Sequence, residues 1–179
     1  QVMSGPHPLD HTSLEAWPAD YMGRLDEGVK GKRVAFSMDL GHARVDPEVA
    51  DIVRKAAENF AANAGITMTD VSPAWGPVGK DLARIMWAAH MTRTAAQLPK
   101  FEHQMDPGLV ACIRDGEKVT MAQYQDARMR KLAYCADIQV WFEDWDFLIT
   151  PTVSVAAFPA EKLIPDHWPQ HAWDWLQWA

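Results

Sequence analysis

The chain has 179 residues, 48% hydrophobic and 23% charged, which is typical of a globular protein with one core and argues against disorder. The net charge of −7 argues against nucleic acid or an anionic membrane as a partner, since both need a basic patch. The chain has only two cysteines, Cys112 and Cys135, and it shows neither a signal-peptide pattern nor an apolar run of about 18 residues. We therefore expect a cytoplasmic protein.

Residues 1–31 are predicted to form an extended connector with turns, because prolines and small polar residues recur along them. His7 and His11 are two candidate metal ligands in this stretch. Pro8, however, disfavours the helix that would place both on one face. We therefore expect solvated or turn-forming histidines here and no metal.

Residues 32–71 are predicted to form a strand, a helix and a second strand. Residues 32–38 and 66–71 have the apolar patterns of short strands. Between them, Asp46 before Pro47 is typical of a helix start, and Gly65 is typical of a helix end. Short joints between these elements indicate a crossover unit, which would be right-handed and is compatible with parallel pairing.

Residues 77–142 are predicted to be helical. Apolar residues recur there at helical spacing, and proline, glycine and threonine mark the boundaries. The predicted helices are Val78–Leu98, ended by Pro99, a shorter helix from Asp106-Pro107 to Ile113, and a long helix from Met121 to about Phe142, capped by Thr120.

Residues 146–153 are predicted to form a short strand that is buried on both faces. Phe147–Ile149 is an apolar run without polar alternation, and Pro151 cannot donate to a continuing ladder. Ligands of open α/β sheets usually bind at the carboxyl ends of the strands. The end of this strand, near Thr152, is therefore a place to look for a site.

Residues 154–179 form a loop rich in proline and tryptophan. His167 and His171 are four apart, but Pro169 lies between them and no glutamate completes the pattern of a zinc protease. We expect an aromatic flap or cover here, with no metal. The tryptophans of this loop are Trp168, Trp173, Trp175 and Trp178.

Three stretches occur in the order and spacing of the amidase signature enzymes. They are residues 4–13 (SGPHPLDHTS), residues 33–49 and residues 146–152 (DFLITPT). The sequence resembles this family, which includes bacterial amidases, fatty acid amide hydrolase and the A subunit of glutamyl-tRNA amidotransferase. The resemblance extends over essentially all 179 residues and is closer to the stand-alone bacterial amidases. It implies an α/β fold that is part of the family's mixed-sheet α/β/α domain.

The resemblance implies hydrolysis of a carboxamide to a carboxylic acid and ammonia or an amine, without a cofactor. In the family a serine nucleophile is activated by a second serine, held by a cis peptide, and by a lysine. The family's Gly-Gly-Ser-Ser type stretch is absent here, since none of the five serines adjoins another. We therefore expect the chain to be a partial domain that follows this signature, with the Ser-cisSer-Lys triad outside it, and to be inactive alone.

The start at Gln1 and the stop at Ala179 within an aromatic run also lead us to expect a longer native protein. Its expected partners are a small amide substrate and the remainder of the amidase domain, and a homo-oligomer is a further option. The resemblance makes four residues candidates for substrate binding, although each could serve in packing alone: Trp75, Trp87, Thr150 and Thr152.

Two other functions stay open at the level of sequence. A non-catalytic α/β binding or interaction domain would use the Trp-rich loop to contact a partner. A histidine-based metalloenzyme would need bound metal. The identity of the substrate cannot be predicted, because the shape of a hydrophobic pocket sets acyl specificity and no motif encodes it.

Overall fold

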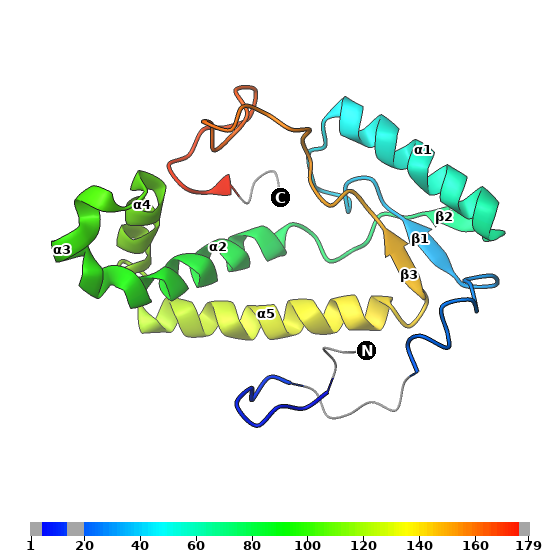
Figure 1. Cartoon of the computed structure of the whole chain (residues 1–179), viewed down its shortest axis with the longest axis horizontal. Helices are drawn as coiled ribbons and strands as arrows, with labels where there is room; N and C mark the ends of the chain where they lie inside the picture. Colours follow the sequence, from blue (N-terminus) through cyan, green and yellow to red (C-terminus); the bar gives the residue numbers. More distant parts are fainter. Residues whose placement is uncertain (1–4, 14–19, 176–179) are drawn as a thin grey trace.

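A three-stranded parallel sheet lies toward one end of the structure, and the helices of residues 78–116 extend away from it (Figure 1). The structure is a computed structural model, and it describes residues 5–13 and 20–175. The strands are β1 (Val34–Phe36), β2 (Met68–Asp70) and β3 (Phe147–Ile149). The sheet order is β2-β1-β3, with Val34 opposite both Met68 and Phe147. The predicted α/β class is confirmed.

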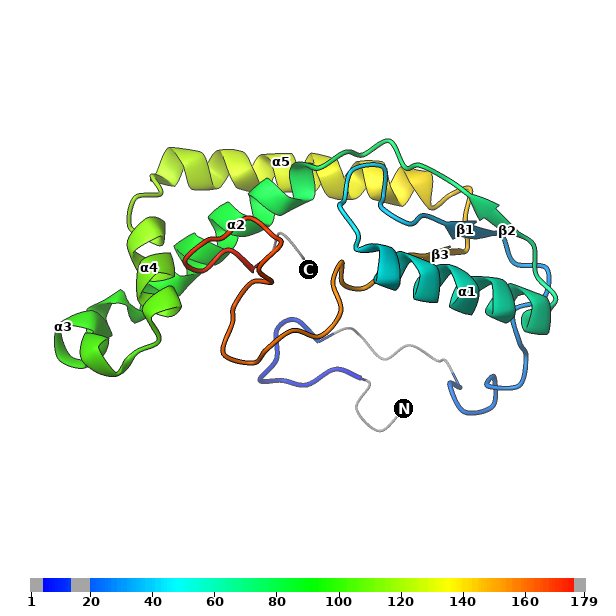
Figure 2. The ribbon, with the colours of Figure 1, turned by 90° about the horizontal axis from the view of Figure 1, so that it is seen from above.

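The predicted strand-helix-strand unit is present, with α1 (Pro47–Ala64) joining β1 to β2. Asp46 precedes the helix, and Gly65 ends it in the left-handed conformation that glycine adopts without strain. Helix α1 lies on one side of the sheet and α5 (Met121–Trp141) on the other (Figure 2). The Arg54 guanidinium of α1 lies 4.1 Å from the centre of the Phe36 ring, which joins the helix to the buried central strand.

Helix α2 (Val78–Met91) packs against both α5 and α4 (Pro107–Gly116). Two of the predicted caps are observed. Asp106 accepts a hydrogen bond from the Leu109 backbone, and Thr120 forms a capping box with Gln123 at the start of α5. Both helices therefore begin where the sequence predicts.

The prediction of one continuous helix from Val78 to Leu98 is wrong. The α-helix ends at Met91, and the chain continues through η1 (Thr92–Gln97), α3 (Leu98–Phe101) and η2 (Glu102–Gln104). The hydroxyls of Thr92 and Thr94 donate to carbonyls three residues earlier, an arrangement that competes with regular helical bonding. Pro99 lies in the first turn of α3, where its missing N–H costs nothing, so it does not end a helix.

The predicted strand at residues 146–153 is shorter than expected and less buried. Strand β3 spans Phe147–Ile149, and Pro151 lies just beyond its end. The expectation of burial on both faces is wrong for Phe147, whose exposed fraction is 45%. Strand β3 pairs with β1 alone and forms an edge of the described sheet, so one flank has no neighbouring strand in the part of the chain described.

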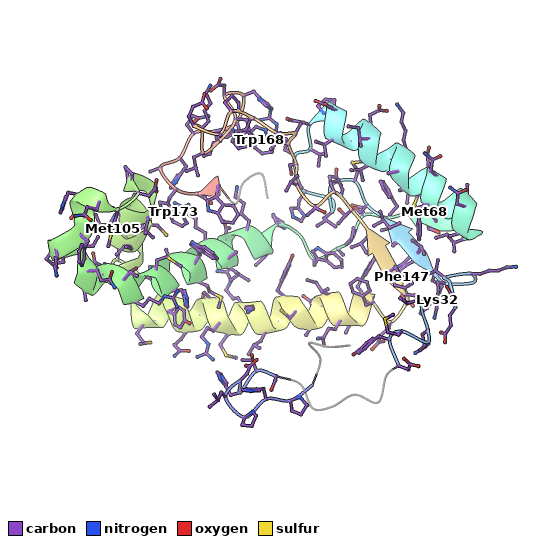
Figure 3. All side chains as sticks on the ribbon, viewed as in Figure 1. Lys32, Met68, Met105, Phe147, Trp168 and Trp173 are labelled. Carbon is purple, nitrogen blue, oxygen red and sulfur yellow. The ribbon has the colours of Figure 1, made fainter. Side chains whose placement is uncertain are left out.

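Residues 154–175, the tail segment, run from β3 past the start of α1 to α2 and α4 (Figures 1 and 3). Trp168 and Trp173 anchor it, with exposed fractions of 6% and 4%. His167 pairs with Asp46 at 2.7 Å, before α1. Trp178, Ser4 and residues 14–19 of the predicted connector lie outside the described residues.

Candidate functional site

A cavity of about 350 Å³, the strand-end cavity, lies where β1 and β3 end. Because the strands are parallel, the loops that follow them meet at one edge of the sheet, where ligands of open α/β sheets bind. The start of α2 and one side chain of α5 complete the wall. The polar lining residues include Asp39, His42, Lys80, Tyr134, Thr150 and Thr152.

The loop after β1 is held by side chains that bond to its own backbone. Ser37 is buried, and its hydroxyl accepts a hydrogen bond from the Leu40 N–H at 3.0 Å. Asp39 accepts one from the Gly41 N–H at 2.8 Å. Leu40 has a φ of +52°, which is uncommon for a residue other than glycine. Such strain persists only where the surroundings impose it, and it is concentrated at functional sites.

His42 presents one defined nitrogen to its surroundings. Its Nδ1 lies 2.9 Å from the Leu40 carbonyl oxygen, which can only accept, so Nδ1 carries a proton. In the neutral imidazole, Nε2 is then the hydrogen-bond acceptor. Together with Asp39, His42 supplies the cavity with acceptors for a ligand's N–H groups.

The floor of the cavity depends on a close approach between α2 and α5. A Cβ at Gly79 would lie 3.0 Å from the phenolic oxygen of Tyr134, so with a larger residue there the Tyr134 ring would have to shift by a few tenths of an ångström. Burial raises the pKa of Tyr134, and the neighbouring Cys135 adds to the shift. Tyr134 therefore stays a neutral donor near pH 7, and Lys80 adds an ammonium group.

The structure brings together two of the four candidate substrate-binding residues. Thr150 and Thr152 both line the strand-end cavity. Trp75 instead packs edge-on against Trp141, with ring centres 5.1 Å apart. Trp87 lies on α2 beside a different cavity. A role in substrate binding stays a prediction for all four.

Sequence reasoning did not single out His42 or Lys80. His42 follows the first strand as Thr150 follows the last, so the same rule about carboxyl ends would have found it. Lys80 has no such signal, because only the packing of α2 brings it to the sheet edge. Within the described ranges, no group of three or more His, Cys, Asp or Glu side chains is placed to hold a metal ion.

The model of the family described as Amidase matches residues 1–179. The chain belongs to the amidase family. An acylamidase of Rhodococcus erythropolis is 28% identical to it over 167 residues, which is 92% of this chain and 35% of the relative. This amidase-family chain thus spans about a third of that relative's length. The predicted family resemblance is confirmed.

Solved structures agree on the fold. One, described as a vestigial complex that reveals the origins of an s-triazine catabolic enzyme, matches 99% of this chain and 39% of its own with a TM-score of 0.80 at 21% identity. A bacterial aryl acylamidase of the amidase signature enzymes matches 84% of this chain and 33% of its own, with a TM-score of 0.70 at 20% identity. At these identities the likeness establishes the amidase signature fold and leaves the substrate open.

Nothing in the described helices is both long and apolar enough to cross a membrane. The cytoplasmic location and the absence of a nucleic-acid partner stay predictions from the sequence.

Proposed function

We propose that this chain is part of an amidase that hydrolyses a carboxamide to a carboxylic acid and ammonia or an amine. The family match over residues 1–179 carries the proposal. In it, the Ser-cisSer-Lys triad lies outside the chain, and the strand-end cavity forms one wall of the substrate pocket. Thr150 and Thr152 are proposed to contact the substrate there.

The arrangement of the serines in this chain supports a catalytic triad that lies outside the chain. No two of the five are adjacent in sequence. Ser37 lies at the sheet edge, but it is buried and its hydroxyl is already used by the Leu40 N–H. An activated serine needs a base or a second hydroxyl within hydrogen-bond reach, whereas the Ser37 hydroxyl is bonded to a backbone N–H.

Exposed apolar side chains on α5 support the proposal that another part of the protein packs over this helix. Met129, Leu132 and Val140 are exposed along this helix, although a long helix in a globular protein normally buries its apolar residues. We propose that the remainder of the amidase domain covers them. The relative from Rhodococcus, about three times as long as the matched region, has the additional chain to do so. A second copy of this chain is the competing occupant.

The two rival functions have less support. A binding domain that docks through its tryptophans would need them accessible, yet Trp168 and Trp173 are buried within the chain. Trp173 also donates from Nε1 to Asp115 at 2.9 Å, and the Arg44 guanidinium lies 4.5 Å from the Trp168 ring centre. A histidine metalloenzyme would need a ligand cluster, which the described part of the chain does not contain.

The proposal is tested by following acid and amine release from aryl and alkyl carboxamides. The protein that carries these residues behind a Gly/Ser-rich segment should hydrolyse at least one amide, and the 179-residue chain alone should hydrolyse none. Turnover by the chain alone would overturn the location of the triad. A longer protein without activity on the whole set would overturn the function.

The role of the cavity is tested in the same assay with two threonine variants. We expect Thr150→Val to lower kcat/KM about tenfold, the effect of one lost hydrogen bond of about 1.4 kcal/mol. Thr69→Val is the matched control, because Thr69 is an exposed strand residue on β2, outside the lining of the cavity. Equal activity of the two variants would remove Thr150 from the site. Sedimentation of the 179-residue chain would separately show whether a second copy covers α5.

A further inference from the structure

A second cavity, of about 230 Å³, lies between α2, α4 and the tail segment, and three tryptophans line it. We call it the tryptophan cavity. We propose that it binds a small organic cation, a tertiary or quaternary alkylammonium group. Its tryptophans are Trp87, Trp173 and Trp175, and its lining includes the carboxylate-bearing residue Asp106. This proposal is independent of amide hydrolysis.

The aromatic rings are arranged as the walls of a cage. The rings of Trp87 and Trp175 meet edge to face, with centres 5.9 Å apart and planes at 85°, so they form a nearly perpendicular corner of the cavity. Trp173 is buried, and the bond from its Nε1 to Asp115 holds its ring in place. Figure 3 shows Trp173 beside α2 and α4. Tryptophan is the aromatic residue that attracts cations most strongly, and aromatic cages are the usual sites for quaternary ammonium groups.

The charge of the lining favours a cation. Asp106 is the one charged residue among the described residues that line the cavity. Its Oδ1 accepts the Leu109 N–H at 2.9 Å, which fixes the carboxylate at the start of α4. Arg84 lies 5.9 Å from the Trp173 ring, but it lines a neighbouring cavity and its charge faces Asp174 at 3.7 Å. The charge of Arg84 is therefore partly neutralised.

The size and apolar lining define the kind of cation. A volume of about 230 Å³ is below the range of drug-sized sites, so the ligand is small. Apolar side chains fill the rest of the wall and suit methyl groups better than the strongly hydrated N–H donors of a primary ammonium. They are Met91, Leu109, Cys112 and Leu163.

Trp87 makes the cavity accessible and the proposal testable. With an exposed fraction of 44%, Trp87 stands at the rim, so its replacement removes a cage wall without opening a buried core. Asp106 is also exposed, and asparagine caps a helix about as well as aspartate. Asp106→Asn therefore removes the charge while it keeps the size and the cap.

The experiment compares choline with 3,3-dimethylbutan-1-ol, which has the same shape with carbon in place of the charged nitrogen. Binding to the protein is followed by titration calorimetry, with tryptophan fluorescence as a second readout. We expect choline to bind saturably and at least about tenfold more tightly than the neutral alcohol. Neither measurement depends on amide turnover, so a failure here and a failure of the amidase proposal are distinguishable.

Two variants locate the binding. We expect Asp106→Asn and Trp87→Leu each to weaken choline binding about tenfold. Asp137→Asn, an equal change of charge at an exposed position on α5, should leave it unchanged. The proposal is overturned if choline does not bind, if the neutral alcohol binds equally well, or if Asp106→Asn and Asp137→Asn bind choline alike.

Discussion

Gly116, the last residue of α4, is a position where one methyl group should have a large effect. An added Cβ would lie 2.0 Å from the carbonyl oxygen of Ala88 and 2.8 Å from Cγ2 of Thr92. The Ala88 oxygen belongs to the α2 backbone and cannot rotate away, so α4 would have to move off α2. Such overpacking costs about 1–3 kcal/mol, whereas replacing glycine by alanine in a helix gains about 1 kcal/mol. The net effect of these two terms is that Gly116→Ala should lower the free energy of unfolding by up to about 2 kcal/mol.

Urea denaturation followed by circular dichroism and tryptophan fluorescence measures this free energy. Ala133→Gly, an exposed position in the middle of α5, is the matched control, because it reports helix propensity without a steric contact. It should cost about 1 kcal/mol. A Gly116→Ala protein that is more stable than the unmodified chain would show that propensity outweighs the contact, and the close packing of α2 on α4 would be refuted.

Three further predictions concern single side chains. Burial raises the pKa of the Cys112 thiol to about 11, so iodoacetamide at pH 8 should alkylate exposed Cys135 in the native chain and Cys112 only after unfolding. Mass spectrometry of the peptides measures the labelling, and equal labelling of the two cysteines in the native chain would contradict this prediction. Hydrogen bonds from Arg33, the backbone N–H first, lower the pKa of Asp146. The stabilisation from this lowered pKa is present above the unfolded pKa of about 3.9 and is lost as pH falls through the folded pKa. Asp146→Asn should therefore flatten the acid side of a plot of unfolding free energy against pH. An unchanged curve would show that Asp146 does not contribute to the pH dependence of stability. Thr120→Ala removes the capping box of α5 and should cost about 1 kcal/mol in urea denaturation, and a loss below about 0.3 kcal/mol would show that the cap contributes little.

Local chemistry explains why much of the fold could be predicted. Pro47 and Gly65 act on the backbone within a few residues of themselves, so the bounds of α1 follow from the sequence. The same holds for Asp106 and Thr120, whose side chains bond to N–H groups three residues ahead. Asp46 precedes α1 without a side-chain cap bond, and its carboxylate pairs with His167 instead. The break after Met91 escaped prediction because hydrophobic spacing does not report which carbonyls the threonine hydroxyls of η1 will take.

The site depended on contacts between distant segments. The sequence marked Thr150 and Thr152 because they follow a strand, and that rule is local. It could not place Trp75 against Trp141, or Trp87 in a cavity with tail residues more than eighty positions away. Nor could it show that Phe147 lies on an edge strand and stays partly exposed.

The sequence by itself determined the family, the class of fold and the order of its elements, since periodicity, caps and motif spacing act over short stretches of chain. Only the tertiary structure decided which loops share the edge of the sheet and which tryptophans face one another. Those arrangements depend on how α2 packs between α4 and α5, and on the path by which the tail segment returns to them, and neither is encoded in neighbouring residues.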